Sequence, residues 1–108
     1  MRKGFLTIFL LFSLAWQQSY SEPFVAGLNA MDREHYATAF RAWKGLADSG
    51  EAEAQNNLGF LYQHGHGAKQ SYTKAIRFYE MASDQGLPEA THNLGMLYFQ
   101  GYGAVSYT

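Results

Sequence analysis

The feature that most constrains this chain is an internal repeat with a period of 36 residues. When the sequence is shifted by 36 positions, residues 50–68 fall on residues 86–104, and 11 of these 19 positions are identical without a gap. The same shift aligns residues 36–50 with residues 72–86 more loosely. Such a period is typical of proteins that stack copies of one supersecondary unit. We therefore expect the apolar side chains to be buried between successive units.

Each period is predicted to form two helices. The first covers about residues 51–64, where apolar residues recur at helical spacing: Ala54, Leu58, Leu61 and Tyr62. The second covers about residues 72–85, with an apolar face made of Ala75, Phe78, Tyr79 and Ala82. Small residues that face large aromatic ones are the alternation that closely packed helix pairs need.

Glycines mark the ends of these helices and one point inside them. Gly65 and Gly67 are expected to end the first helix, and Gly86 the second, because glycine readily takes the left-handed conformation. Gly59 lies inside the first helix, where glycine costs about 1 kcal/mol relative to alanine. Because Gly95 repeats it one period later, we expect it to allow close approach of a neighbouring helix.

The flanks carry weaker copies of the same pattern. Residues 33–47 resemble another second helix, with an apolar side made of Tyr36, Phe40 and Trp43, and residues 24–31 form a short, degenerate first helix. After residue 104 the next second helix would be due, yet the sequence ends at Thr108. No polar terminal cap of the kind that repeat proteins need is present. The sequence therefore predicts either a fragment of a longer protein or a covered terminal face, with self-association through the uncapped C-terminal repeat as one route.

The N-terminus has the organisation of a secretory signal peptide. A positively charged start precedes a run of twelve mostly apolar residues, 5–16, which is shorter than the ~20 residues that span a bilayer. Small residues at Ser19 and Ser21 predict cleavage after Ser21, with Ala15 as the weaker choice. The alternative is a retained membrane anchor. A signal peptide at residues 1–21 predicts an exported protein, periplasmic in a bacterium and otherwise secreted, that meets a membrane only transiently.

Charge and cysteine content exclude other classes of function. Removal of Arg2 and Lys3 takes the formal net charge from −1 to −3, so no basic surface for nucleic acid is expected. The chain has no cysteine, and the exported domain must therefore be stabilised by packing without disulfides.

Two segments together resemble the Sel1-like repeat family, a relative of the tetratricopeptide repeat. Residues 52–67 match the pattern A-x-A-x-x-x-L-G-x-x-Y-x-x-G-x-G, and residues 74–86 match K-A-x-x-[WF]-[YF]-x-x-A-A-x-x-G, except that Ser83 replaces the second alanine of the pair. The matching motif positions of this chain include Ala54, Leu58, Gly59, Tyr62, Gly65, Gly67, Ala75, Tyr79, Ala82 and Gly86.

The resemblance implies a division of the chain and a function. Residues 22–50 would be a divergent N-terminal half or first repeat, residues 51–86 a complete repeat, and residues 87–108 the first half of a further, truncated repeat. It implies an all-α solenoid, an α/α superhelix, that binds a protein or peptide, with no catalytic residues and no cofactor. We expect a right-handed solenoid of about two and a half units. Some exported relatives bear disulfides and are linked to β-lactam binding, which the absence of cysteine does not support here.

Residues with potential for chemistry are few. His64 and His66 supply at most two ligands, whereas zinc takes three or four, and the next period has Gln100 and Tyr102 in their places. We therefore expect solvated loop histidines and no metal site. The sequence contains no hydrolase, zinc-protease or phosphate-loop motif, so we expect no enzyme activity.

A partner site is predicted on the first helices, opposite their buried stripe. At 100° per residue, the side chains on that side are Asn56, Phe60 and Gln63, with His92, Met96 and Phe99 one period later. In related superhelices the first helices line the concave surface, where exposed apolar groups mark binding sites. The alternative is that stacking between units buries these residues. Rival functions are an envelope-associated enzyme, a cell-wall or antibiotic-binding accessory, and an inactive fragment.

Overall fold

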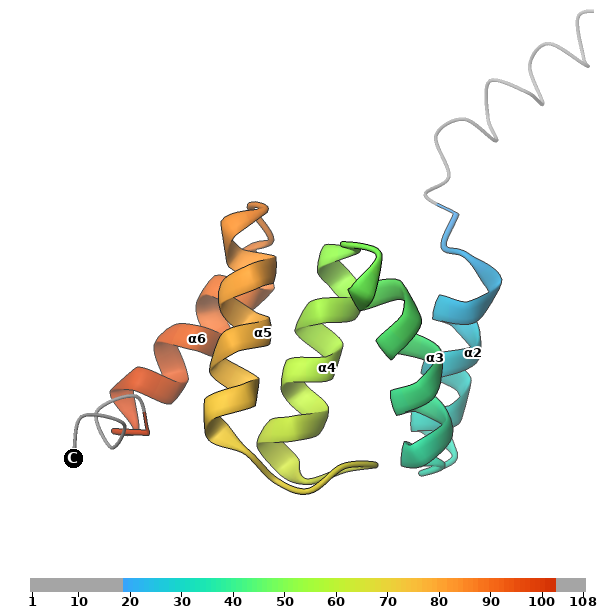
Figure 1. The fold of residues 1–108 in the computed structure, drawn as a ribbon, viewed down its shortest axis with the longest axis horizontal. Coiled ribbons are helices and arrows are strands. Elements are labelled where there is room, and N and C mark those ends of the chain that lie inside the picture. The colour runs from blue at the N-terminus through green and yellow to red at the C-terminus, as the bar shows by residue number, and fades with distance from the viewer. Residues whose placement is uncertain (1–18, 103–108) are drawn as a thin grey trace, which may run out of the picture.

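A computed structural model describes residues 19–102 as a row of helices that lie side by side in chain order (Figure 1). The helices are α2 (Glu22–Asp32), α3 (Tyr36–Asp48), α4 (Ala52–His64), α5 (Tyr72–Asp84) and α6 (Pro88–Phe99). No strand occurs within residues 19–102, so the all-α prediction is confirmed. Most of the expected signal peptide, residues 1–18, lies outside the described residues.

Local sequence explains where the helices begin and end. The Oγ atoms of Ser21 and Ser71 accept hydrogen bonds from the backbone N–H groups of Phe24 (3.4 Å) and Lys74 (3.1 Å), which caps α2 and α5. Gly65 ends α4 with φ of 69°, the left-handed conformation that favours glycine. The predicted helix boundaries within residues 51–86 are therefore confirmed to within one residue.

The turn between α2 and α3 departs from the prediction. The expected start of α3 at residue 33 was wrong by three residues, since α3 begins at Tyr36. Glu34 takes φ of 59°, and the N–H of His35 donates to the carbonyl of Ala30 at 2.8 Å, which closes a tight turn over residues 33–35. The corresponding connection between α4 and α5 covers residues 65–71. This difference in length explains why the 36-residue period fades upstream.

In α2 and α4, a glycine faces an aromatic ring of the second helix that follows. A Cβ atom on Gly59 would lie 2.6 Å from ring carbons of Tyr79, so close approach of a neighbouring helix is confirmed. In the N-terminal pair, a Cβ atom on Gly27 would overlap the indole of Trp43. The Nε1 of Trp43 also donates to the carbonyl of Phe24 at 3.2 Å. The pair α2–α3 is thus built like the pair α4–α5, although its sequence is divergent.

The predicted stripes of α4 and α5 are buried except for Phe78, which is partly buried. In α3, Trp43 is buried as predicted, whereas Tyr36 and Phe40 are partly buried and Ala39 takes their place in the core. Around these contacts lie the fully buried alanines and leucines of the core: Ala39, Ala54, Leu58, Leu61, Ala75, Ala82, Ala90 and Leu97. Small residues at so many positions let the helix axes come close together. Tyr62 lies between Phe40 of α3 and Phe78 of α5, with ring centroids 5.4 and 5.6 Å away.

A stacking contact of the loop after α4 recurs after α6. The ring of Tyr36 stacks on His66 with centroids 4.0 Å apart, and one period later Tyr72 stacks on Tyr102 at 3.8 Å. Gly67 has φ of 77° and lies against the backbone carbonyl of Tyr36, where no Cβ would fit. The second glycine of the loop therefore provides close packing on α3 as well as turn geometry.

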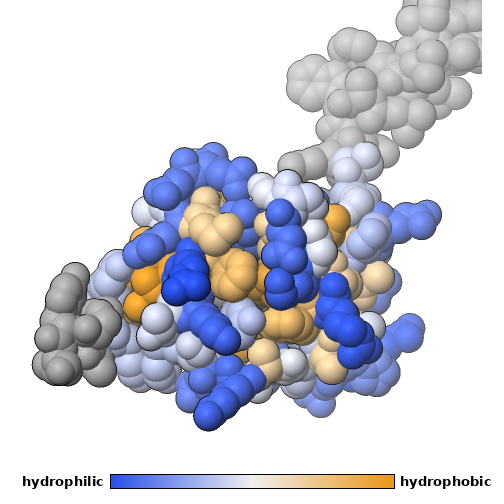
Figure 2. All heavy atoms as spheres, viewed as in Figure 1, coloured by the Kyte–Doolittle hydropathy of each residue, from blue (hydrophilic) through white to orange (hydrophobic). Residues whose placement is uncertain are grey.

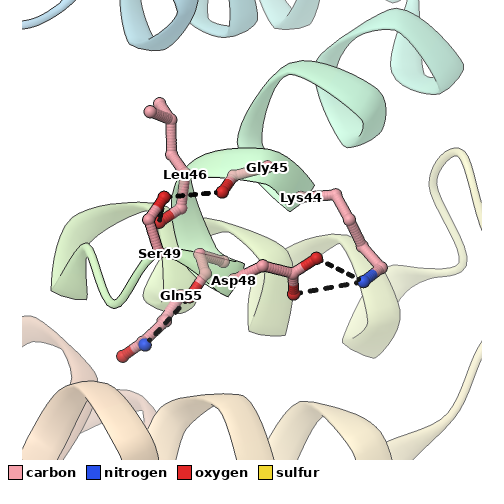
Figure 3. Close-up of polar contacts among 7 residues, drawn as sticks. Lys44, Gly45, Leu46, Asp48, Ser49 and Gln55 are labelled. Atoms are coloured by element: carbon pink, nitrogen blue, oxygen red, sulfur yellow. Dashed lines mark hydrogen bonds and ion pairs between the residues drawn. The ribbon is translucent and has the colours of Figure 1, made fainter.

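Polar contacts join successive pairs at the turn between α3 and α4 (Figure 3). Buried Gln55 donates to the carbonyl of Ala47 at 3.2 Å and accepts from the Nε2 of Gln85 at 2.8 Å. It therefore links α3, α4 and α5. The exposed pair Lys44–Asp48 nearby, at 3.0 Å, is worth little because water screens it. No buried side-chain nitrogen or oxygen within the described residues lacks a hydrogen-bond partner.

Candidate binding groove on the first helices

One exposed apolar side chain follows the glycine in each first helix. Leu28, Phe60 and Met96 come directly after Gly27, Gly59 and Gly95 in α2, α4 and α6, and they are 40%, 39% and 42% exposed. Because the first two glycines face their second helices, the residues at the next position lie at equivalent places on successive units. We call these three side chains the first-helix row.

A hollow of about 430 Å³, lined by Leu28 of this row, lies between α2, the first half of α4 and the start of α6. Its lining combines apolar side chains, amides and two carboxylates: Tyr20, Phe24, Leu28, Glu53, Asn56, Asn57, Leu87 and Glu89. A second hollow of about 360 Å³ adjoins it near the turn between α5 and α6, and the two share Tyr20, Glu53 and Leu87. Together they form a groove across three successive first helices.

Tyr20 forms one wall of both hollows. Its ring stacks on Phe24 with centroids 4.7 Å apart and an interplanar angle of 22°. A hydrogen bond to Glu53 and the negative charge of that carboxylate raise the pKa of the Tyr20 phenol, with a smaller contribution from Glu89. Tyr20, two residues before α2, thus places an aromatic hydrogen-bond donor against the acidic side of the groove.

The three predicted partner residues of α4 lie in different settings. Asn56 lines the groove and accepts a hydrogen bond from the Nδ2 of Asn93 at 3.0 Å. Phe60 belongs to the first-helix row, and its ring packs on His64 with centroids 4.3 Å apart. Gln63 accepts a hydrogen bond from the hydroxyl of Tyr79 at 2.7 Å, so its side chain is held within the α4–α5 pair.

The three predicted partner residues of α6 are all exposed. Met96 belongs to the first-helix row, and Phe99 is the most exposed large apolar side chain among the described residues, at 87%. His92 is exposed on the same helix. None of these three lines either hollow, so they lie outside the groove.

Sequence reasoning missed most of the groove. Asn56 was predicted, whereas the apolar and acidic lining was not: Tyr20, Phe24, Leu28, Glu53, Leu87 and Glu89. The missed residues come largely from α2 and from helix starts, where the repeat pattern is weakest. Gly27, 32 residues before Gly59, is the signal that identifies α2 as a first helix.

His64 is the last residue of α4 and not a loop residue as predicted, and both His64 and His66 are in contact with aromatic rings. His66 stacks on Tyr36, and the centroids of His64 and His66 lie 5.9 Å apart. Partial burial and then the charge of His66 lower the pKa of His64. Within residues 19–102 no three metal-binding side chains come together.

Comparison with known proteins places these features in a family. The sequence model of the Sel1 repeat matches residues 52–87 and 88–107, which together make up more than half of the chain. Among solved structures, c5321, described as a protective antigen present in uropathogenic Escherichia coli strains and displaying an SLR fold, is 32% identical with a TM-score of 0.69. The match covers 73% of this chain but 18% of that protein, so the chain spans about a fifth of its length. No functionally curated protein matches significantly.

Proposed function

Since the chain belongs to the Sel1 repeat family, we propose that it is a non-catalytic, exported scaffold that binds an extended protein or peptide segment across its first helices. The observations that carry the proposal are the groove across the first helices, lined by Leu28, and the partial exposure of Leu28, Phe60 and Met96 at equivalent positions. Exposed apolar groups rimmed by polar ones are typical of interaction sites.

The groove suits a partner segment better than a small molecule. It receives side chains from α2, from α4 and from the start of α6, and Leu28 of the apolar row lines it. Figure 2 shows, for one face of the molecule, apolar atoms over the central helices with hydrophilic side chains around them. Repeat scaffolds present extended surfaces of this kind to partners.

The ionisable groups within residues 19–102 do not form an enzyme-like cluster. Side chains with a shifted pKa are dispersed: Tyr20 lies in the groove, His64 at the end of α4, Tyr79 in the core and Tyr102 beyond α6. An acid–base site would gather such groups in one pocket. This distribution supports a binding role and gives no support to the envelope-enzyme alternative.

Export through residues 1–21 is part of the proposal. No helix within the described residues has the length and apolar character to cross a membrane. Cleavage after Ser21 would remove the side chain that caps α2, whereas cleavage after Ala15 would keep it. The intact mass of the protein recovered from the periplasm or medium would distinguish these sites, and recovery of the uncleaved chain in the membrane fraction would support the anchor alternative.

A crosslinking pull-down with matched methionine variants tests the binding face. Met96 of the first-helix row and Met81 of α5 are 42% and 40% exposed, so Met96→Asp and Met81→Asp place the same charge at equal exposure on different helices. We expect Met96→Asp and Phe60→Asp to lose the partner and Met81→Asp to retain it, at equal helicity. If Met81→Asp loses the partner as well, or none of the variants does, binding across the first helices is wrong.

A further inference from the structure

We infer that the part of the groove formed by Phe24 and Glu53 is a subsite for a tyrosine side chain of the bound segment, and that the chain's own Tyr20 occupies this part while residues 19–21 remain attached. The inference rests on the proposed function, because it specifies what the scaffold recognises. The occupant is identified by Tyr20, which stacks on Phe24 and lines the hollow in the structure.

The apolar part of the subsite fits an aromatic ring. Phe24 is buried on the core side and offers one ring face to Tyr20 at a centroid distance of 4.7 Å. Leu28 and Leu87 complete the apolar lining from α2 and from the residue before α6. Offset stacking at this distance is the arrangement that aromatic pairs favour.

The polar part of the subsite selects a hydrogen-bond donor. Glu53 and Glu89 both line the hollow, and neither forms an ion pair with a basic side chain within residues 19–102. A carboxylate only accepts hydrogen bonds, so it pairs with the phenol hydroxyl and repels an anion. The subsite should therefore prefer tyrosine to phenylalanine and should reject phosphotyrosine, which carries about two negative charges.

Processing decides whether the subsite is vacant. Cleavage after Ser21 removes Tyr20 and exposes Phe24 and Glu53 to a partner, whereas cleavage after Ala15 leaves Tyr20 in place. In the form that keeps Tyr20, a partner has to displace this tethered residue. Its apparent affinity is the intrinsic affinity multiplied by the fraction of time for which the subsite is open. The two cleavage sites that the sequence allows thus give two forms with different affinity.

The test vacates the subsite without shortening the chain. The full chain with Tyr20→Ala, in a nonionic detergent, is titrated with the six-residue peptide of residues 17–22, Gln-Gln-Ser-Tyr-Ser-Glu. NMR signals of the Leu28 methyl groups and of the Asn56 and Asn57 side-chain amides report on the lining. We expect these signals to shift, with about tenfold weaker binding to the wild-type chain, where Tyr20 competes.

Variants of the peptide and of the chain test the chemistry. The phenylalanine peptide should bind about fivefold more weakly, since one hydrogen bond is lost, and the alanine and phosphotyrosine peptides should not bind. Adding Glu53→Gln to Tyr20→Ala should weaken binding of the tyrosine peptide, whereas Asp84→Asn, which removes an exposed charge on α5, should not.

Two results would overturn the inference: equal binding of the tyrosine and alanine peptides, or equal effects of Glu53→Gln and Asp84→Asn. No binding of any peptide to the Tyr20→Ala chain would also overturn it. The pull-down with Met96→Asp and Met81→Asp tests the scaffold function separately from the peptide titrations. If the peptide results contradict the subsite but Met96→Asp alone loses the partner, the scaffold function stands and only the tyrosine subsite is wrong.

Discussion

Helices α4 and α6 lie 36 residues apart and carry the same alanine, leucines, glycine and tyrosine, but their surroundings differ. α4 is followed by α5, whose Tyr79 ring covers Gly59. At Gly95 of α6, a Cβ atom would meet nothing within 4 Å among the described residues. The comparison shows that the helix that packs next determines what a repeat residue contributes to stability, since its sequence position is the same in both cases.

We expect the largest difference in stability between changes in α4 and changes in α6 when the repeated tyrosine is replaced by alanine. Tyr62→Ala would leave a cavity between Phe40 and Phe78 and should cost about 3 kcal/mol of unfolding free energy. Tyr98→Ala should cost about 1 kcal/mol, because Tyr98 is 47% exposed and its hydroxyl donates to Glu80 at 3.0 Å on the surface. Urea unfolding followed by circular dichroism measures both, and equal losses would mean that α6 is as completely packed as α4.

Substitution of the repeated glycine should give effects of opposite sign. Gly59→Ala forces the new methyl group against the Tyr79 ring, and this strain outweighs the gain in helix propensity, for a net loss of about 1 kcal/mol. Gly95→Ala adds a methyl group in open space and should stabilise the helix by up to about 1 kcal/mol. A loss at both positions would show that a contact outside residues 19–102 covers Gly95.

The sequence predicted the central unit well for a physical reason. Within residues 51–86, helical periodicity, glycine caps and the internal repeat all favour the same structure, and even the role of Gly59 followed from its recurrence. The start of α3 was placed too early because periodicity does not reveal that Glu34 adopts a left-handed turn. One turn of different length was enough to hide the equivalence of α2 and α4.

The candidate site was less predictable because it depends on distances between helices. A helical wheel places Gln63 opposite the buried stripe, but its long side chain reaches the Tyr79 hydroxyl across the pair. The groove brings together Tyr20, Glu53 and Glu89, which precede or begin three different helices. The spacing of these residues in the sequence does not predict that they lie close together, because their proximity depends on how successive helix pairs pack.

Removal of a single hydroxyl group should give a smaller difference in stability loss between buried Tyr79 and exposed Tyr98. Tyr79→Phe removes the 2.7 Å hydrogen bond to Gln63 and should cost about 1 kcal/mol, since the amide oxygen loses a partly buried donor. Tyr98→Phe removes an exposed hydrogen bond to Glu80 and should change stability by less than about 0.5 kcal/mol. The same urea experiment compares them. A larger loss at Tyr98 would place the more important hydroxyl on α6 and reverse the comparison.

The smallest expected effect concerns the last residue of α4. Partial burial and the charge of His66 lower the pKa of His64 below its unfolded value of about 6.5, so the unfolded chain binds more protons. This residue's stabilising contribution is complete above pH 6.5 and is lost as the pH falls through the folded pKa. His64→Gln introduces the residue that α6 carries at Gln100 and should flatten the decline of stability between pH 7 and pH 5. His35→Gln, in the exposed turn before α3, is the control, and the same flattening in both would show that the packing of His64 on Phe60 has no part in the effect.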